Sequence, residues 1–577
     1  MMIGDRVRDL LRVSIKDAGF AAPREIPMEV PPADVEAHYA SPVALSLAKP
    51  AGKAPRAVAE AIAEALRARI AADSSLPVAS VELAGPGFIN LTLGRSVLAA
   101  ETVKAAEAGD SWGSFDELAG KRVLCEYSCP NPFKPLHVAH LMANSIGEAL
   151  SRLYENAGAA VTRVTYGGDI GLHVAKAIWG MGQATPGAPK DGAPLAVRVR
   201  FVGAAYAAGA AAYEENPEAK VAIDDLNGRI FSGEMSSEEK SWYDRGRAWS
   251  VEHFNDVYAA IGSHFDAEVW EREIEKRGKE TVLANVGTVF EESEGAIVFR
   301  GERVGLHTRV FITAKGLPTY EAKDIGWALE KEDRWHPDLA VLETGAEQTQ
   351  YFQVVQAALA EIAPAIPPKT LHVTHGLMRL ADGKISSRKG NTMIALDLLE
   401  AAREKVREVL AEREVPVENA AAVANAVAVA AIKYQILKQS PGKDIVFDLD
   451  AATALDGDSG PYLQYAAVRA STLVKKAEEA GVVASTMPPV GEFASDLEMA
   501  IARLPEILRR AYRERAPQLV ATHLVSLAAA FNRWYDTARV VGEEPKTAGW
   551  RLTVATAAQN AVSSGLATLG IAVPARM

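Results

Sequence analysis

The stretch KRVLCEYSCPNPFKPLHVAHL, residues 121–141, runs from a strand through a proline-broken loop into a helix. Its first part, KRVLCEYS, is a short apolar run that predicts a buried strand. The helix continues as HVAHLMANSIGEALSRLYENAG and is expected to stop at Gly158. A strand that leads directly into a helix is the first unit of an open, doubly wound sheet.

The same alternation continues on the C-terminal side of this unit. Short apolar segments rich in β-branched residues recur as AVTRVTY (160–166), RVFIT (309–313), LAVLET (339–344) and LHVTHG (371–376). Strands that alternate with helices predict a parallel sheet, so we expect an α/β, Rossmann-type domain over residues 108–391. The stretch 182–301 interrupts the pattern and is interpreted as an inserted subdomain.

The regions on either side of this domain have other patterns. Residues 1–107 open with a helix and close with VELAGPGFINLTL (81–93), a strand pair broken at GPG, which predicts a small α+β domain. Apolar residues at helical spacing predict a helical connecting region over 392–450 and an all-α bundle over 451–577.

Composition narrows the class of protein. The 577 residues are 49% hydrophobic and 24% charged, as in a multidomain soluble protein. No uninterrupted apolar run approaches ~20 residues, and Asp5 and Asp9 make the N-terminus an amphipathic helix rather than a signal peptide. We therefore expect a cytoplasmic protein that binds no membrane. A monomer is the expected oligomeric state, although no sequence pattern indicates it.

The cysteine content excludes two further site types, whereas the net charge excludes none. Two cysteines, Cys125 and Cys129, are too few for a disulfide framework or a zinc ribbon, so no structural zinc and no metal site in the protein is expected. The net charge of −12 argues mildly against nucleic-acid binding, but a large acidic protein can be basic along one face.

Two histidines begin the helix that follows the first strand. His137 and His140 are three residues apart, so they share one face of the helix near its N-terminus. Phosphate binds at such a terminus, and two imidazoles there can hydrogen-bond phosphate oxygens. A helix-capping pair or half of a metal site would explain an isolated His-x-x-His equally well.

A cationic loop follows the last expected strand of the domain. DGKISSRKGN, residues 382–391, places Lys384, Arg388 and Lys389 between two glycines. A loop of this kind can close on a triphosphate and stabilise its transition state. Without the histidine pair, a solvated surface turn would explain it as well.

Together the two features resemble the HIGH and KMSKS signatures of class I aminoacyl-tRNA synthetases, here HVAH and KISSR in the family's order. Several other segments resemble the arginyl-tRNA synthetase family: EYSCPNPFKPLHVAHL (126–141), TYGGDIG (165–171), PTYEAKDIG (318–326), GDSGPYLQYAAVRA (457–470), AFNRWYDTARV (530–540), GLATLGIAVPARM (565–577) and VELAGPGFINLTL (81–93). The resemblance covers nearly the whole chain apart from residues 183–239.

The resemblance implies a reaction and its catalytic residues. The arginine carboxylate attacks the α-phosphate of ATP, which carries Mg²⁺, pyrophosphate leaves, and the 3′ end of tRNA(Arg) takes the arginyl group. Positioning and charge stabilisation are the protein's main contributions. The implied catalytic residues are His137, His140, Lys134, Lys384 and Arg388. The implied ATP-binding residues are Gly168, Asp169, Ser386 and Ser387, together with the two histidines.

The arginine pocket follows from the same resemblance and from charge. Arginine's planar cation requires carboxylates in a matching plane. Glu126 and Asp324 are expected to hold the guanidinium, Tyr320 to pack against it or donate to it, and Asn131 to hold the α-amino or carboxylate end; Gln348 matches the family's pocket glutamine. Taken singly, Glu126 could be a strand-end surface carboxylate, and Asp324 a helix N-terminal charge.

Four positions depart from the family's pattern. Ala139 replaces the glycine of the first signature, and Ser387 replaces the second lysine of KMSKS. Arginyl enzymes that lack this lysine supply the charge from a lysine three residues before the first histidine, which here is Lys134. Ile170 and His173 replace the usual tryptophan and glutamine. The role of His173 is open, and a core histidine is an equal alternative.

Aromatic and polar residues of the bundle suit recognition of an RNA loop, because aromatics stack on splayed bases. Aromatics at helical spacing usually form core, so about half of these residues are expected to be buried. The candidates are Tyr462, Gln464, Tyr465, Arg469, Asn532, Arg533, Trp534 and Tyr535. By resemblance, Phe88 and Asn90 of the N-terminal domain would touch the tRNA elbow.

Three alternatives remain. The cysteinyl and glutaminyl types lack support, because the chain has no zinc ligands and no C-terminal β-barrels. A nucleotidyltransferase with the same histidine pair would usually be shorter and lack the bundle. A non-catalytic tRNA-binding paralogue of a class I synthetase is disfavoured by the intact catalytic and pocket residues.

Overall fold

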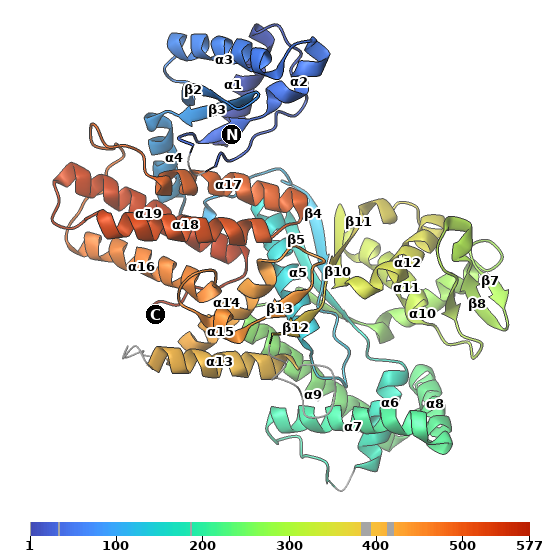
Figure 1. Cartoon of the computed structure of the whole chain (residues 1–577). Helices are drawn as coiled ribbons and strands as arrows, with labels where there is room; N and C mark the ends of the chain where they lie inside the picture. Colours follow the sequence, from blue (N-terminus) through green and yellow to red (C-terminus); the bar gives the residue numbers. More distant parts are fainter. Residues whose placement is uncertain (1, 33–34, 185–186, 382–393, 412–419) are drawn as a thin grey trace. The chain divides into compact units, whose positions relative to one another are not determined.

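The structure is a computed structural model that describes residues 2–577 apart from 33–34, 185–186, 382–393 and 412–419. The chain divides into two compact units. Unit 1 comprises Met1–Phe115, Tyr465–Ala511 and Leu519–Leu566, and unit 2 comprises Asp116–Gln464, Tyr512–Gln518 and Ala567–Met577. The chain therefore begins in unit 1, builds unit 2, and returns to unit 1 for most of its C-terminal helices (Figure 1).

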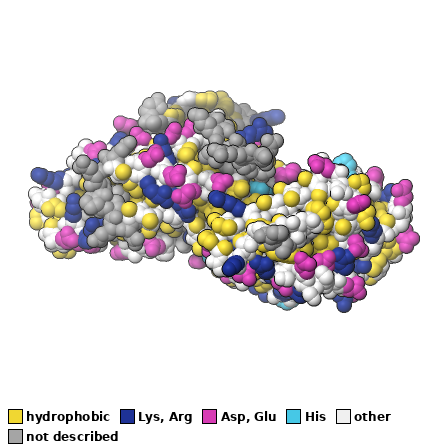
Figure 2. Space-filling view, turned by 90° about the horizontal axis from the view of Figure 1, so that it is seen from below, with side chains coloured by type: hydrophobic (Ala, Val, Ile, Leu, Met, Phe, Trp, Pro, Cys, Tyr) yellow, Lys and Arg dark blue, Asp and Glu magenta, His cyan; other side chains and the backbone are white. Residues whose placement is uncertain are grey.

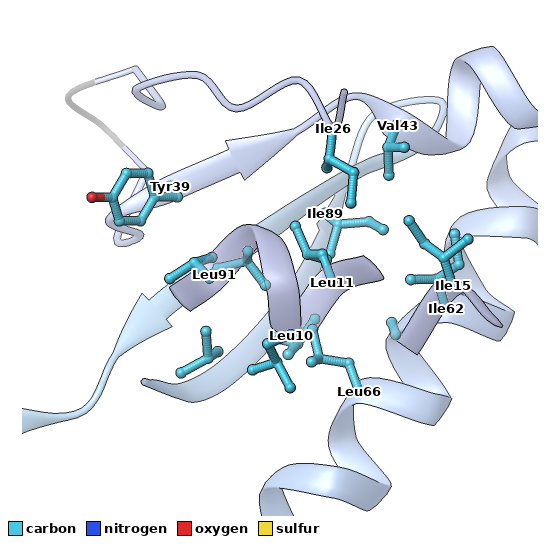
Figure 3. Close-up of a cluster of buried hydrophobic side chains, with 14 of the residues drawn as sticks. Leu10, Leu11, Ile15, Ile26, Tyr39, Val43, Ile62, Leu66, Ile89 and Leu91 are labelled. Atoms are coloured by element: carbon cyan, nitrogen blue, oxygen red, sulfur yellow. The ribbon is translucent and has the colours of Figure 1, made fainter. Parts of the chain in front are cut away.

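Unit 1 opens with a small α+β module. Its strands are β1 (Tyr39–Ser41), β2 (Val78–Ala84) and β3 (Phe88–Leu93), and its helices are α1 (Ile3–Asp17), α2 (Val43–Ala51) and α3 (Pro55–Ala72). The strands form an antiparallel sheet in the order β1-β3-β2, with Gly85 at a positive φ between β2 and β3. Leu11 of α1 and Ile62 of α3 pack against Ile89 and Leu91 of β3 (Figure 3). The α+β expectation is confirmed.

The rest of unit 1 is helical, as expected. Its elements are α4 (Arg95–Ala108), the 3-10 helix η1 (Gly109–Ser111), most of α16 (Gly460–Glu479), α17 (Asp496–Glu514), α18 (Gln518–Thr537) and α19 (Pro545–Thr568). Within unit 1, α17 packs on the α+β module: Glu506 accepts hydrogen bonds from the Gly4 backbone N–H at 2.5 Å and from the Tyr39 hydroxyl at 2.8 Å.

Unit 2 is organised around a five-stranded parallel sheet, which confirms the doubly wound α/β expectation. The strand order is β11-β10-β4-β5-β6, with bounds β4 (Arg122–Glu126), β5 (Ala160–Gly167), β6 (Ala267–Trp270), β10 (Leu339–Gly345) and β11 (Thr370–His375). Strand order reverses beside β4, because the chain continues to β5 on one side and later returns to β10 on the other. Open α/β sheets bind ligands at such a reversal, outside the carboxyl ends of the strands.

Helices pack on both faces of this sheet. They are α5 (Val138–Asn156), α10 (Glu271–Ala284), α11 (Tyr320–Trp335) and α12 (Thr349–Ile362). Leu124 of β4 packs in one cluster with Ile274 of α10 and Trp327 of α11. The next residue, Cys125, lies instead beside Ser151 of α5. Successive side chains of a strand point to opposite faces, so β4 is buried on both.

Two expectations for this sheet are wrong. RVFIT forms β9 (Arg309–Ile312), which is not in the parallel sheet but pairs antiparallel with β8 (Ala296–Phe299), which in turn pairs with β7 (Glu291–Ser293). Conversely β6, which pairs with β5, lies inside the stretch 182–301 that was interpreted as an insertion. A short apolar run predicts a strand but carries no information about its partner.

The helices of the inserted stretch form a core of their own. They are α6 (Leu172–Gln183), α7 (Leu195–Glu215), α8 (Pro217–Ser232) and α9 (Ser237–Ile261). This core includes Phe133 and Ile170, so the insert packs directly against the two loops that follow β4 and β5. By length and hydropathy alone, α7 and the later helix α14 (Ala420–Leu437) are apolar enough to cross a membrane, but α14 is mostly buried within the protein.

The expected helical connecting region contains one strand that the sequence did not reveal. Its helices are α13 (Ala395–Ala411), α14 and α15 (Leu449–Thr453). The described part of unit 2 also contains the 3-10 helices η3 (Gly301–Val304), η4 (Ala346–Gln348) and η5 (Pro367–Lys369). The strand β13 (Ile445–Phe447) pairs in parallel with β12 (Met378–Leu380). Three residues are too few to show a period of two.

Candidate active site

The candidate residues of unit 2 converge at the carboxyl edge of the parallel sheet. Glu126 ends β4, Gly168 follows β5, and Gln348 follows β10. The loop after β4 is sharply bent: Ser128, Cys129 and Phe133 all have positive φ, which is uncommon for residues with a side chain. This bend brings the chain from the end of β4 to the start of α5.

The two histidines lie at the N-terminus of α5, with ring centroids 5.8 Å apart. Nδ1 of His140 accepts a hydrogen bond from the His137 backbone N–H at 3.0 Å, so its ring proton is on Nε2 when it is neutral. Burial, aided by the charge of His137, lowers the pKa of His140 to about 4. Burial, aided by Lys134, lowers the pKa of His137 as well. Both rings are therefore neutral hydrogen-bonding groups at pH 7.

Nδ1 of His137 is buried and has no hydrogen-bond partner among the residues that the structure describes. A buried polar atom without a partner costs free energy, which a ligand can recover. The pair thus caps its helix, as the alternative interpretation supposed, and still offers polar atoms for a ligand.

The turn after β5 is tied to the loop after β4. The Gly168 backbone N–H donates to Oδ1 of Asn131 at 3.2 Å, and a Cβ at Gly168 would lie only 2.3 Å from that oxygen. Asp169 is buried and accepts from the Tyr243 hydroxyl, Arg247 and the Arg272 backbone. Its carboxylate is therefore occupied within the protein.

His173 lies on the inner side of the same turn. It is buried, and its Nε2–H donates to the Gly168 carbonyl at 2.8 Å. Burial lowers its pKa to about 3, so it is a neutral donor that holds the turn. This contact corresponds to the core-histidine interpretation.

Glu126 and Asp324 line one cavity, together with Trp327 and Lys331. Each of these two carboxylates has a close partner within the protein. Nζ of Lys331 donates to Glu126 at 2.5 Å, and the Tyr351 hydroxyl donates to Asp324 at 2.5 Å. Burial raises the pKa of Asp324 to about 7, and the charges of Glu126 and Glu271 add to the rise.

The other candidates for the arginine pocket lie around this pair. Tyr320 begins α11 and is 48% exposed, with Nζ of Lys323 4.2 Å from its ring centroid. Lys323 is itself buried in an ion pair with Glu271. Gln348 is exposed at the N-cap of α12. The exposed ring of Tyr320 offers an aromatic surface of the kind that stacks on a planar cation.

The sequence did not reveal three residues of this region. Lys331 lies seven residues after Asp324 on α11, and Tyr351 lies three residues after Gln348, so helical spacing was the available signal in both cases. His375 ends β11, and its Nδ1 lies 2.6 Å from Oε1 of Glu343. Burial opposes protonation of His375, but the hydrogen bond and charge of Glu343 outweigh it and raise its pKa.

The cationic loop, with Lys384, Ser386, Ser387 and Arg388, lies outside the described residues. The described chain resumes beside the histidines: Ile394 bridges His137, and the Ala395 backbone N–H donates to the Leu136 carbonyl at 2.8 Å. Lys134 is half-buried in the loop before α5, with Nζ 4.9 Å from the ring centroid of Tyr206.

The two cysteines form no disulfide. Cys125 and Cys129 are free, and burial raises the pKa of Cys125 to about 12. The described residues hold no group of three His, Cys, Asp or Glu side chains that could bind a metal ion.

The tRNA candidates differ in exposure. Gln464 of unit 2 is fully buried and donates to the Ala426 and Ala572 carbonyls, and Asn90 is buried in unit 1, so neither side chain is presented to a ligand. Phe88, Tyr462, Tyr465, Asn532, Trp534 and Tyr535 are half-buried, and Arg533 is exposed.

In unit 1, Arg469 of α16 contacts three residues of α18. Its guanidinium lies 3.9 Å from the Tyr535 ring centroid and donates to Asn532 at 3.1 Å and to Asp536 at 3.2 Å. On the face shown in Figure 2, Lys and Arg side chains lie interspersed with Asp and Glu side chains.

Known proteins resemble the whole chain. An arginine–tRNA ligase of Clostridium perfringens is 29% identical over 568 residues, covering 95% of this chain and 96% of its own. One of Treponema pallidum is 29% identical and covers 90% and 89%. The solved arginyl-tRNA synthetase of Thermus thermophilus superposes with a TM-score of 0.78 at 25% identity, covering 99% of each chain.

Three family models match in succession. They describe an arginyl-tRNA synthetase N-terminal domain (5–93), a class I (R) tRNA synthetase catalytic domain (108–195 and 248–449) and a DALR anticodon binding domain (463–577). Because the catalytic-domain model alone covers about half of the chain and the other two cover most of the rest, the chain belongs to the arginyl-tRNA synthetase family, the class I ligases that use ATP to join arginine to tRNA.

Proposed function

We propose that this chain activates L-arginine at the carboxyl edge of the parallel sheet in unit 2 and transfers it to the 3′ end of tRNA(Arg). The observation that carries the residue assignment is the cavity that Glu126 and Asp324 line together; Glu126 ends β4, the strand that leads to the histidine pair. A pocket for a flat cation requires carboxylates from separate elements to meet, and these come from β4 and α11.

Charge favours Asp324 as the primary guanidinium partner. Glu126 already pairs with Lys331, and Glu271 with Lys323, whereas Asp324 forms no ion pair within the described part of the chain. A buried carboxylate without a cation is unstable as an anion, and an incoming guanidinium removes that instability. Glu126 completes the pocket wall, Tyr320 stacks, and Gln348 and Asn131 are assigned to the α-amino and carboxylate end.

The phosphates of ATP are assigned to the N-terminus of α5. Neutral His137 and His140 donate to phosphate oxygens, and Lys134 supplies the positive charge that Ser387 does not. Lys384, Ser386 and Arg388 are assigned to the same phosphates. Gly168 brings backbone close to the nucleotide, with Asp169 holding the turn.

Mg²⁺ is proposed to enter on the phosphates of ATP rather than in a protein cage, since ATP-utilising sites hold Mg²⁺ largely through phosphates and water. The described residues offer no cluster of three ligands to hold it otherwise, and no structural zinc is proposed. For tRNA, the assigned contacts are the half-buried and exposed side chains around Arg469 and Phe88. The enzyme is proposed to act as a cytoplasmic monomer that binds no membrane.

The test is aminoacylation of total tRNA by the purified chain with each of the twenty amino acids in turn. Arginine alone should be attached, and only when ATP is present. Attachment of another amino acid would overturn the pocket assignment. Binding of tRNA(Arg) without any attachment would favour the alternative, a non-catalytic paralogue.

A further inference from the structure

Helix α7 lies in a part of the chain that the family's catalytic-domain model does not match, residues 196–247. One of its side chains nevertheless reaches the loop between β4 and α5. The ring of Tyr206 lies under the Lys134 ammonium, with 4.9 Å between Nζ and the ring centroid, and both side chains are half-buried. A cation over an aromatic face at this distance is attracted to the ring.

The loop that carries Lys134 and the helix that carries Tyr206 are packed against each other. A Cβ at Gly203, three residues before Tyr206, would lie 3.7 Å from Pro135, the neighbour of Lys134. Phe133, on the other side of Lys134, is buried in the same core as Val202 of α7. Its backbone N–H donates to the Ser250 hydroxyl of α9 at 2.9 Å. The loop that carries Lys134 thus rests on the insert.

Helix α7 is in turn fixed to α6, which begins just after the turn of Gly168 and Asp169. A Cβ at Gly180 of α6 would lie 2.1 Å from the Ala205 carbonyl oxygen, and one at Gly209 of α7 would lie 1.9 Å from that of Lys176. The two backbones therefore touch at both glycines, one helix turn apart on α7, and this contact leaves Tyr206 little freedom to move away from the loop.

We propose that Tyr206 is a positioning residue for ATP use: its ring holds the Lys134 ammonium toward the phosphate end of the site, which gives the unmatched helix α7 a part in catalysis. The proposal rests on the assignment of Lys134 to the phosphates. Without the ring, the flexible lysine side chain spreads over other rotamers and spends less time where the phosphates bind.

The test uses the full-length enzyme with arginine, ATP and tRNA, and measures pyrophosphate exchange. Tyr206→Leu removes the ring and should lower kcat/KM for ATP about two- to fivefold, the value of an accessible cation–π contact, while KM for arginine stays unchanged. Tyr206→Phe keeps the ring and should recover the activity. If the Tyr206→Leu enzyme melts below the temperature of the assay, the Tyr206→Met enzyme is used in its place.

A matched control lies on the same helix. Tyr213 also carries a lysine over its ring, with Nζ of Lys176 4.0 Å from the centroid, but this pair is outside the proposed site. Tyr213→Leu should leave both KM values and kcat as they are. An equal loss with Tyr213→Leu would show that the helix acts only through its stability.

A double-mutant cycle with Lys134→Met decides between positioning and packing. Because Tyr206 is proposed to act through Lys134, adding Tyr206→Leu to the Lys134→Met enzyme should not lower kcat/KM for ATP any further. The same loss in both backgrounds, or faster exchange with Tyr206→Leu, would overturn the proposal. Full exchange by Lys134→Met alone would instead overturn the assignment of Lys134, and absence of arginine charging by the unaltered enzyme would overturn the proposed function.

Discussion

The distribution of charge among single residues determines what the cavity of unit 2 can bind. In the described part of the chain, lysines neutralise two of the carboxylates that line it, Glu126 and Glu332, whereas the third, Asp324, receives only the Tyr351 hydroxyl. One uncompensated buried carboxylate matches one cationic ligand. We therefore propose that the pocket selects by charge before it selects by shape.

Asp324→Asn should preserve the shape of the pocket and remove its charge. Loss of one partner of a buried ion pair costs about 3 kcal/mol, which corresponds to a roughly hundredfold rise in KM for arginine. KM for ATP should change little, and both values follow from pyrophosphate exchange with tRNA present. Asp333→Asn, an exposed carboxylate on the same helix, is the matched control. Equal effects on arginine and ATP would remove Asp324 from the pocket.

The pKa of Asp324 predicts how arginine binding depends on pH. The free protein has this pKa at about 7, and the guanidinium requires the ionised form. Binding therefore releases a proton below pH 7, and affinity should fall about tenfold for each pH unit below that value and level off above it. Calorimetric titration of arginine between pH 5.5 and 8.5 measures this. The slope should vanish in Asp324→Asn, and an unchanged slope there would assign it to another group.

At the scale of elements, the sequence predicted strands and helices well and their partners poorly. β4, β5, β10 and β11 each follow from a short apolar run, but β9 has the same pattern and pairs in another sheet. The pattern records burial, and pairing depends on contacts between distant parts of the chain. β6 was missed because AEVW is only four residues long and lies among helices.

In the candidate site, too, the sequence predicted the elements better than it predicted the contacts between them. The motif around His137 follows β4 of the parallel sheet, so its position at the carboxyl edge was predictable, whereas Asp324 lies on α11, which follows β9 of the other sheet. The motifs did not predict Lys331, Tyr351 or Tyr206, whose parts depend on which face of a helix the tertiary packing turns toward the cavity. Helical spacing gives the candidate faces but not the choice among them.

Because α6 and α7 cross closely, adding one methyl group at a glycine of the crossing should lower the stability of the protein. Gly209→Ala would place Cβ 1.9 Å from the Lys176 carbonyl oxygen, so the helices must separate. Overpacking of this kind costs about 1–3 kcal/mol, and thermal unfolding should show a lower melting temperature.

Gly228→Ala in α8 is the matched control for that crossing. Nothing lies within 4 Å of its Cβ, so the change should be neutral or stabilising by about 0.5–1 kcal/mol, the usual gain of alanine over glycine in a helix. Equal melting temperatures for the two variants would mean that the helices separate without cost.

At the scale of the whole molecule, the two units carry different parts of the task. Arg469 of unit 1 is proposed to contact tRNA, so Arg469→Gln should raise KM for tRNA(Arg) about five- to thirtyfold, the value of one stacked or ionic base contact. KM values for arginine and ATP should not change. Aminoacylation at varied tRNA concentration measures the effect. Lys475→Gln removes an exposed cation from the same helix and should have little effect.

The division of arginine activation and tRNA contacts between the two units predicts that tRNA controls arginine activation, a step that does not consume tRNA. By resemblance to the family, arginine activation in unit 2 should require bound tRNA, so pyrophosphate exchange should be absent from the enzyme alone and appear with tRNA(Arg). A tRNA(Arg) whose 3′-terminal ribose is oxidised cannot accept arginine, yet it should still support exchange, because the requirement is for binding rather than transfer. To the extent that bound tRNA raises the affinity for arginine and a non-hydrolysable ATP analogue, these two ligands should raise the affinity for tRNA by the same factor, because linkage of binding is reciprocal. Arg469→Gln should then demand more tRNA for half-maximal exchange but reach the same plateau, whereas exchange at full rate without tRNA would mean that the site of unit 2 is complete by itself.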